Sequence, residues 1–209
     1  MTFRKQRGFS MIEMLIVLAV VIILAGIGFI TLVPMLNKEH VDTAYDKTLE
    51  TLRIYRNLSI TQSRNYIVTF APAAGAAPAT MTISWWPGGG PPRPAAVQVN
   101  VVTLPPDVDF RIQAGLPNAA NAVPDGFGTG AAAVDLDYTP AGGGAGATVV
   151  FMPDGSVQDL GGNPDSGVVY MSRIVPDLYS TRAITVWGAT GRIRGWRLVN
   201  AGGPTWVQQ

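Results

Sequence analysis

Few residues in this chain have the chemistry of a catalytic or metal site. The sequence contains a single histidine, His40, and no cysteine, which excludes thiol nucleophiles, thiolate metal sites and disulfides. No serine lies in a Gly-x-Ser-x-Gly elbow, and the glycine runs at 88–90 and 142–144 lack the lysine and hydroxyl residue of a phosphate-binding loop. His40 has no second ligand at metal spacing, so we interpret it as solvated. The sequence therefore predicts no enzyme, no cofactor and no metal site.

Carboxylates are concentrated between residues 107 and 165, where Arg111 is the only basic residue. They are Asp107, Asp109, Asp125, Asp135, Asp137, Asp154, Asp159 and Asp165. A carboxylate pair or a calcium site could use such groups, although their spacing supports neither strongly. Asp125-Gly126 and Asp154-Gly155 are typical of turns, because aspartate bonds its local backbone and glycine accepts a positive φ. We interpret these pairs as turns, with a calcium site as the alternative.

Cationic residues gather after this acidic block, in the last part of the chain. Arg192, Arg194 and Trp196 alternate, so in a strand they project from one face. A cationic row beside an aromatic ring can contact phosphates and stack on bases, which makes DNA a candidate ligand, with Arg197 as a further contact. The alternative is that these arginines pair with carboxylates of the acidic block or of a neighbouring subunit.

Glu13 is an ionisable residue inside an apolar stretch that begins at Phe9. No charge follows it from residue 14 to residue 36, and such a run spans about 35 Å as a helix, enough to cross a bilayer. Arg4, Lys5 and Arg7 precede the run, which predicts a cytoplasmic N-terminus and an exported remainder. No small-x-small cleavage site follows the run, so we expect the helix to remain in the mature protein. A carboxylate at this depth needs a partner.

Beyond the membrane the apolar spacing predicts that the helix continues to about residue 63. Residues three or four apart form its buried face, namely Val41, Tyr45, Leu49, Leu52 and Arg56 or Ser59. Polar residues between them form the solvent face, namely Asp42, Asp46, Lys47, Glu50 and Arg53.

The remainder is rich in glycine and proline, and its alternating patterns favour antiparallel strands. Strands are predicted at 66–70, 81–85, 96–104, 108–112, 148–152, 168–172, 182–187 and 192–198. Long loops are predicted at 71–78, 87–94, 116–133 and 140–147. The chain is therefore expected to be an α+β protein with a long N-terminal helix packed on a small antiparallel β-sheet head.

The N-terminal residues Arg7-Gly8-Phe9-Ser10-Met11-Ile12-Glu13 resemble the type IV prepilin signal. The resemblance implies that a prepilin peptidase cleaves between Gly8 and Phe9 and methylates the new amine of Phe9. It also implies that this amine pairs with Glu13 of an adjacent filament subunit, although the i to i+4 spacing also allows pairing within one chain. An uncleaved signal anchor, with Glu13 reaching toward the membrane interface, is the alternative.

Motifs in the remainder resemble H-type secretion pseudopilins and FimT-type minor pilins. They are Arg64-Asn65, Leu104-Pro105-Pro106, Phe151-Met152-Pro153-Asp154-Gly155 and Gly191-Arg192-Ile193-Arg194. The resemblance implies a leader at 1–8, a transmembrane assembly helix at 9–36, an amphipathic stalk helix at 37–63 and a periplasmic head at 64–209. The implied location is the bacterial inner membrane, as a single-pass protein that enters a filament after processing.

The resemblance leaves two functional classes open. The first is a filament subunit, for which the implied partners are prepilin peptidase, other pilins or pseudopilins and an inner-membrane assembly platform. The second is a DNA-binding minor pilin, because a Gly-Arg-x-Arg stretch is associated with DNA binding in FimT-like proteins. Arg192, Arg194, Trp196 and Arg197 would make that contact.

Overall fold

The computed structural model describes residues 10–87, 95–119, 121–128, 132–136, 147–158 and 163–209, without the side chains of 29–38. Gly8, Phe9, Asp137, Asp159 and most of the predicted loops at 87–94 and 140–147 lie outside these residues. The chain divides into two compact units between Glu39 and His40. The second unit contains all the strands that the structure describes.

The helix α1 extends over Met11–Gln62. From residue 40 onward its predicted apolar face is confirmed, because Val41, Tyr45 and Leu52 are buried and Leu49 is partly buried against the core. Two polar residues were predicted as alternatives at the end of this face. Ser59 is buried, and the longer Arg56 is half-buried. One-sided burial of this kind fixes how the helix is rotated against the strands.

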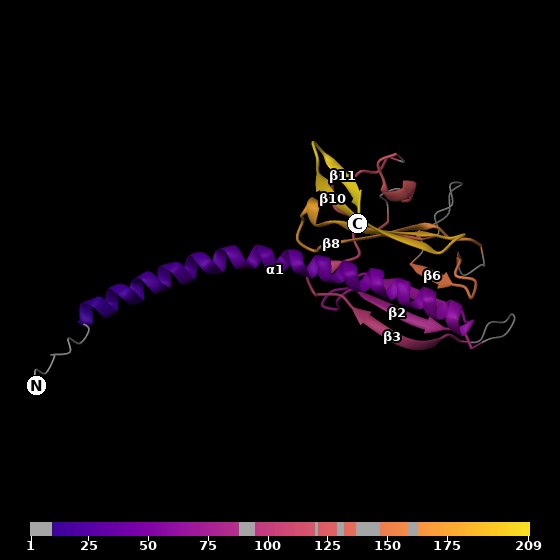
Figure 1. Cartoon of the computed structure of the whole chain (residues 1–209), viewed down its shortest axis with the longest axis horizontal. Coiled ribbons are helices and arrows are strands. Elements are labelled where there is room, and N and C mark those ends of the chain that lie inside the picture. Colours follow the sequence, from indigo (N-terminus) through magenta and orange to yellow (C-terminus); the bar gives the residue numbers. More distant parts are fainter. Residues whose placement is uncertain (1–9, 88–94, 120, 129–131, 137–146, 159–162) are drawn as a thin grey trace, which may run out of the picture. The chain divides into compact units, whose positions relative to one another are not determined.

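The strands form two antiparallel sheets, which confirms the predicted α+β class. The first sheet has the order β3 (Val97–Thr103), β2 (Thr80–Trp85), β1 (Tyr66–Ala71), β6 (Thr148–Phe151) and β7 (Val157–Gln158). The second has the order β11 (Pro204–Gln208), β10 (Arg192–Asn200), β9 (Arg182–Trp187), β8 (Gly167–Arg173) and β4 (Val108–Asp109), with β5 (Val134–Asp135) also paired to β8. Figure 1 shows β2 and β3 on one side of α1 and β8 and β10 on the other.

Most predicted strands match within two residues, but β5, β7 and β11 were not predicted. The predicted strand at 108–112 is also too long, because only Val108–Asp109 pairs with β8. Beyond it, side chains replace the backbone ladder: Arg111 Nη1 donates to the Ile174 carbonyl and Gln113 Nε2 to the Arg173 carbonyl, each at 2.8 Å. Side-chain bonds of this kind are not visible in an alternating sequence pattern.

The main core lies between α1 and the inner faces of both sheets. It joins Val41 and Leu52 of the helix to Val68 of the first sheet and to Val169 and Ile184 of the second. The second sheet is buried on its outer face as well, where a smaller cluster contains Val168, Tyr170, Ala183, Leu198 and Leu116. β8 is therefore buried along nearly its whole length, on both faces.

Candidate assembly site and C-terminal arginines

Glu13 lies in the first turn of α1. The Ser10 carbonyl accepts hydrogen bonds from the backbone N–H of Glu13 at 3.0 Å and of Met14 at 3.2 Å, which starts the helix at this point. A carboxylate in the first turn interacts favourably with the positive end of the helix dipole. Its side chain is exposed. The predicted processing residues, Gly8 and Phe9, lie outside the residues that the structure describes.

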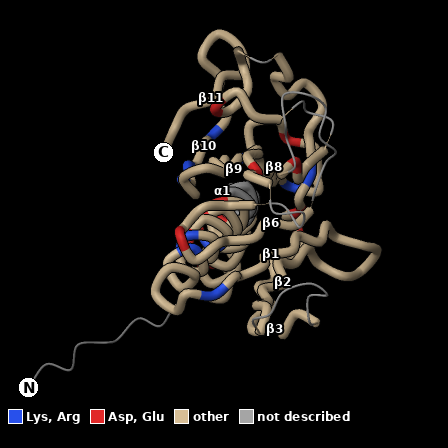
Figure 2. Tube along the Cα trace, turned by 90° about the vertical axis from the view of Figure 1, so that its right-hand side faces the viewer, with Lys and Arg blue, Asp and Glu red and all other residues tan. Residues whose placement is uncertain are grey.

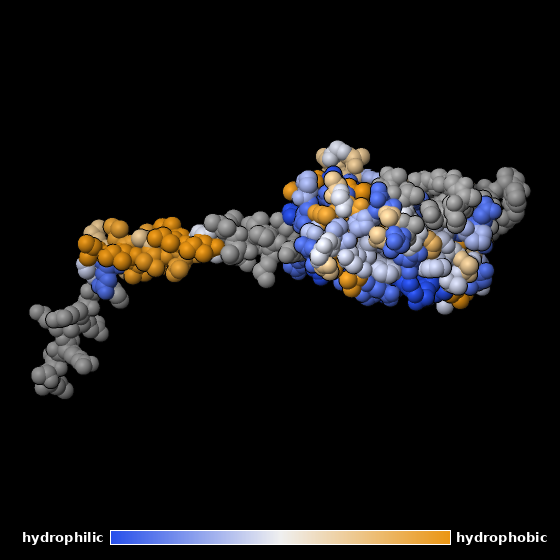
Figure 3. All heavy atoms as spheres, turned by 90° about the horizontal axis from the view of Figure 1, so that it is seen from above, coloured by the Kyte–Doolittle hydropathy of each residue, from blue (hydrophilic) through white to orange (hydrophobic). Residues whose placement is uncertain are grey.

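The helical segment Met11–Gly28 is apolar enough to cross a membrane, with a mean hydropathy of 2.8 over 18 residues and none of it buried inside the protein. Leu15, Leu18, Ile22 and Ile23 each expose more than half of their surface. Exposed apolar side chains therefore follow one another along the whole segment, and the face seen in Figure 3 is almost entirely orange. A surface of this kind needs lipid or another apolar helix around it.

Residues 3–29 match the family described as the prokaryotic N-terminal methylation motif. The N-terminal segment is type IV prepilin-like. The match covers Gly8, Phe9 and Glu13 and ends near the end of the exposed apolar segment. No curated protein and no solved structure matched the chain. The H-type and FimT-type resemblance of the remainder therefore stays a prediction.

The C-terminal arginines differ in their exposure and in their contacts. Arg194 forms an ion pair through Nη1 with Oδ1 of Asp125, whose side chain is only 5% exposed. The same carboxylate accepts a hydrogen bond from the Thr185 hydroxyl, and the Trp196 indole donates to that hydroxyl at 3.0 Å. This observation agrees with the alternative that the arginines meet the acidic block. Positions along β9, β10 and α1 that carry basic residues are blue in Figure 2.

The expected cationic row with a free aromatic platform is therefore not what the structure contains. Arg194 is held by Asp125, and Trp196 is partly buried against the outer cluster of the second sheet. Arg192 remains exposed, and so does Arg197, which alternation places on the opposite face of β10. The row was predicted from alternation alone, which does not reveal the loop that brings Asp125 over this face.

Asp125 also does more than the predicted turn requires. It does lie in a turn, in the short 3-10 segment Pro124–Gly126, with φ of 54°. Asp154, the other predicted turn residue, is exposed, and its Oδ1 accepts from the Ser156 N–H at 2.8 Å. Its hydrogen bonds with Ser156 lower the pKa of Asp154. Both turns are confirmed, but only Asp125 carries a buried ion pair.

We expect Asp125→Asn to destabilise the protein by about 2 kcal/mol, because the half-buried Arg194 loses its counter-charge while the shape of residue 125 is kept. Thermal unfolding of the purified chain measures the effect. Asp154→Asn is the matched control, since it makes the same change in an exposed Asp-Gly turn and should leave the unfolding midpoint nearly unchanged. Equal losses in the two variants would contradict a stabilising role for the ion pair.

Within the second unit, two more contacts connect the part of α1 that begins at His40 to strands and loops. Arg182 on β9 is buried, and its Nε and Nη2 donate to Asp42 Oδ1 at 2.9 and 2.7 Å. His40 Nδ1 lies 2.8 Å from Asp107 Oδ1, so the interpretation of His40 as a merely solvated residue was incomplete. Among the described residues, no group of three or more His, Cys, Asp or Glu lies close enough together to hold a metal ion.

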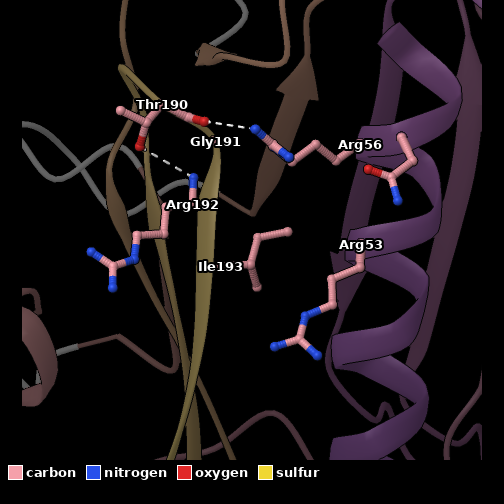
Figure 4. Close-up of a pocket in the computed structure, with 7 residues that line it drawn as sticks. Arg53, Arg56, Thr190, Gly191, Arg192 and Ile193 are labelled. Carbon is pink, nitrogen blue, oxygen red and sulfur yellow. Dashed lines mark hydrogen bonds between the residues drawn. The ribbon is translucent and has the colours of Figure 1, made fainter. Parts of the chain in front are cut away.

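Arg56 connects the helix to two turns and borders a cavity. Its Nε donates to the Gly155 carbonyl at 3.2 Å, and its Nη2 donates to the Thr190 carbonyl at 2.9 Å. Gly155 is in the turn between β6 and β7, and Thr190 is in the turn between β9 and β10. The cavity has a volume of about 340 Å³ and is lined by Arg53, Arg56, Asn57, Thr190, Gly191, Arg192 and Ile193 (Figure 4).

The sequence did not indicate this cavity. The helical period places Arg53 on the polar face of the helix, and alternation places Arg192 in a row with Arg194 and Trp196 on β10. The spacing of Arg53, Arg56 and Asn57, three and four residues apart, does place them on one side of the helix. That signal shows which helix residues are neighbours, but it does not show which turn lies opposite them.

Proposed function

We propose that this chain is a minor pilin or pseudopilin, a subunit that enters or primes a type II secretion pseudopilus or a type IV pilus after processing. The prepilin motif at residues 3–29, followed by a helix with exposed apolar side chains and a folded β-rich unit, carries the proposal. Residues 1–8 are the leader, 9–36 the assembly helix, 37–63 the stalk helix and 64–209 the head.

Processing creates the charge that Glu13 needs. Cleavage between Gly8 and Phe9 by prepilin peptidase exposes an amine, which is then N-methylated and stays cationic. In a membrane or a packed helix bundle, an isolated carboxylate at Glu13 is costly, and a neighbouring cation offsets this cost. The amine of one subunit and Glu13 of its neighbour then set the relative position of two apolar helices.

The topology follows from the same segment. Basic residues before the apolar helix keep the N-terminus in the cytoplasm, so the head is periplasmic and the protein is single-pass in the inner membrane until assembly. The partners at these stages are prepilin peptidase, an inner-membrane assembly platform and other pilins or pseudopilins. This role is assembly and requires no active site.

DNA capture by the head is the second candidate function. The exposed Arg192 beside the turn between β9 and β10 favours it, because exposed arginines are the usual contacts to phosphates. Arg194 supports it less, since that side chain is already paired with Asp125. DNA capture therefore depends on Arg192 and Arg197 more than on the complete Gly191-Arg192-Ile193-Arg194 stretch.

The processing step can be tested by mass spectrometry of the chain isolated from membranes of its native host. We expect a mature protein that begins at an N-methylated Phe9, and an unprocessed chain in cells without prepilin peptidase. Gly8→Val should block cleavage, because a branched side chain replaces the residue that allows the closest backbone approach beside the scissile bond. A mature chain that keeps residues 1–8 would overturn the proposal.

A further inference from the structure

The cavity beside Arg56 has the composition of an anion site. Arg53, Arg56 and Asn57 line it from the helix, and Thr190 and Gly191 line it from the turn between β9 and β10. No acidic residue is among its described lining residues. We call this cavity, with its seven lining residues, the helix–hairpin groove.

Three arginines line the helix–hairpin groove, and the two on the helix differ: Arg56 is anchored and Arg53 is available. Arg56 is fixed by its bonds to the Gly155 and Thr190 carbonyls, so its guanidinium is pre-positioned. Arg53 is exposed, and no described carboxylate lies within ion-pair distance of it. In Figure 4 the Arg53 side chain extends toward β10 below Ile193. An anion placed here would meet positive charge from adjacent turns of one helix.

The backbone that closes the groove is tightly fitted. Gly191 has φ of 59°, and a Cβ at this position would overlap the Gly155 carbonyl oxygen. Both turns are therefore held against each other and against Arg56. Arg56 is therefore already ordered, which lowers the part of the ordering cost of binding that this side chain would add.

We propose that the helix–hairpin groove binds a carboxylate side chain presented by an acidic segment of another protein. A guanidinium group matches the planar geometry of a carboxylate, and a volume of about 340 Å³ accommodates one or two acidic side chains. The inference rests on the proposed function in one respect, because the filament is the place where the chain would meet such a partner. It adds to that role a contact made by the head, independent of Glu13.

Duplex DNA fits the helix–hairpin groove less well. DNA binding by a protein draws on many phosphate contacts spread along the duplex, whereas the arginines of this groove line a small volume. In Figure 4 the Arg192 guanidinium lies on the other side of the strand from Ile193 and points away from the helix. A peptide in the groove therefore depends on Arg53, while DNA on the hairpin surface depends on Arg192.

The test measures binding of a fluorescently labelled oligoglutamate peptide to the purified full-length chain in neutral detergent, by fluorescence anisotropy at low salt. Oligoglutamine is the matched uncharged peptide. We expect Arg53→Gln to weaken oligoglutamate binding by about fivefold, as for the loss of one partly exposed ion pair. Arg53→Lys should keep most of the affinity, since it keeps the charge, and Lys47→Gln, an equal charge change at an exposed residue outside the groove, should alter it less than about twofold.

Several outcomes overturn the proposal. They are the absence of oligoglutamate binding, equal binding of oligoglutamine, and equal loss in Arg53→Gln and Lys47→Gln. A fourth is displacement of the labelled peptide by duplex DNA, if Arg192→Gln abolishes this displacement and Arg53→Gln does not. That result would favour DNA capture. Thermal unfolding of Arg53→Gln should match the unsubstituted chain, because Arg53 is exposed. None of these measurements requires cleavage or a filament, so their failure would leave the proposed function intact.

Discussion

Glu13→Ala is expected to reduce incorporation of this chain into filaments by at least about a hundredfold, since removing one partner of a buried charge pair costs about 3 kcal/mol or more. The N-methylated amine of Phe9 would then be left without its counter-charge among apolar helices. Membrane insertion and cleavage should remain normal, because the basic leader and the apolar segment are unchanged. Quantifying the chain in sheared filaments against the membrane fraction measures the effect.

Glu39→Ala is the matched control for this experiment. Glu39 is an exposed glutamate of the same helix, beyond the apolar segment, so its loss removes an equal charge and should leave incorporation unchanged. Glu13→Gln should be as defective as Glu13→Ala, since it keeps the size of the side chain and removes the charge. Normal incorporation of either Glu13 variant would show that the carboxylate has no role in assembly.

Gly195→Ala is expected to destabilise the head by about 3 kcal/mol, which corresponds to a fall in Tm of roughly 9 °C for a chain of this size. A Cβ at Gly195 would overlap the hydroxyl oxygen of Tyr45 and stand 2.6 Å from its Cζ. Tyr45 is buried on the helix face, and burial raises the pKa of its hydroxyl, with Asp46 a smaller cause. The helix must therefore shift away from β10, and thermal unfolding of the purified chain would detect this.

A double-mutant cycle with Tyr45→Phe tests this explanation. Phenylalanine lacks the oxygen that the new methyl group would meet first, so Gly195→Ala should cost at least about 1 kcal/mol less in the Tyr45→Phe background. If the two substitutions are additive, the loss does not arise from the contact between helix and strand. Gly202→Ala provides a further comparison, since a Cβ there meets no atom within 4 Å, although its φ of 82° also strains an alanine.

Local patterns in the sequence were sufficient to predict the apolar N-terminal helix. An apolar helix of this length, the basic residues before it and a carboxylate in its first turn are all local features, so no distant contact is needed to predict them. The amphipathic face with Val41, Tyr45 and Leu52 was predictable for the same reason. Its period of 3.6 residues is a local property, and packing only confirmed it.

The strands were also predictable where side chains alternate between a buried and a less buried environment. The prediction was poorest where that contrast is absent or short. β5 and β7 have two residues each, too few to show a period, and β11 begins at a proline after Gly202 and Gly203. The pairing of β6 with β1, far apart in the sequence, could not be derived from either strand alone.

The apolar helix, the prepilin-like motif and the α+β class could be read from residue order, because each depends on residues close together in the chain. Which arginines have a carboxylate partner depends instead on how distant segments pack together. Arg194 and Arg192 are two residues apart on one strand, yet Asp125, 69 residues away, pairs with Arg194 and leaves Arg192 exposed. Likewise, Arg53 and Arg56 face a groove because the turn at Thr190 lies opposite them. Ion pairs between distant segments depend on how the chain closes on itself, which residue order does not reveal.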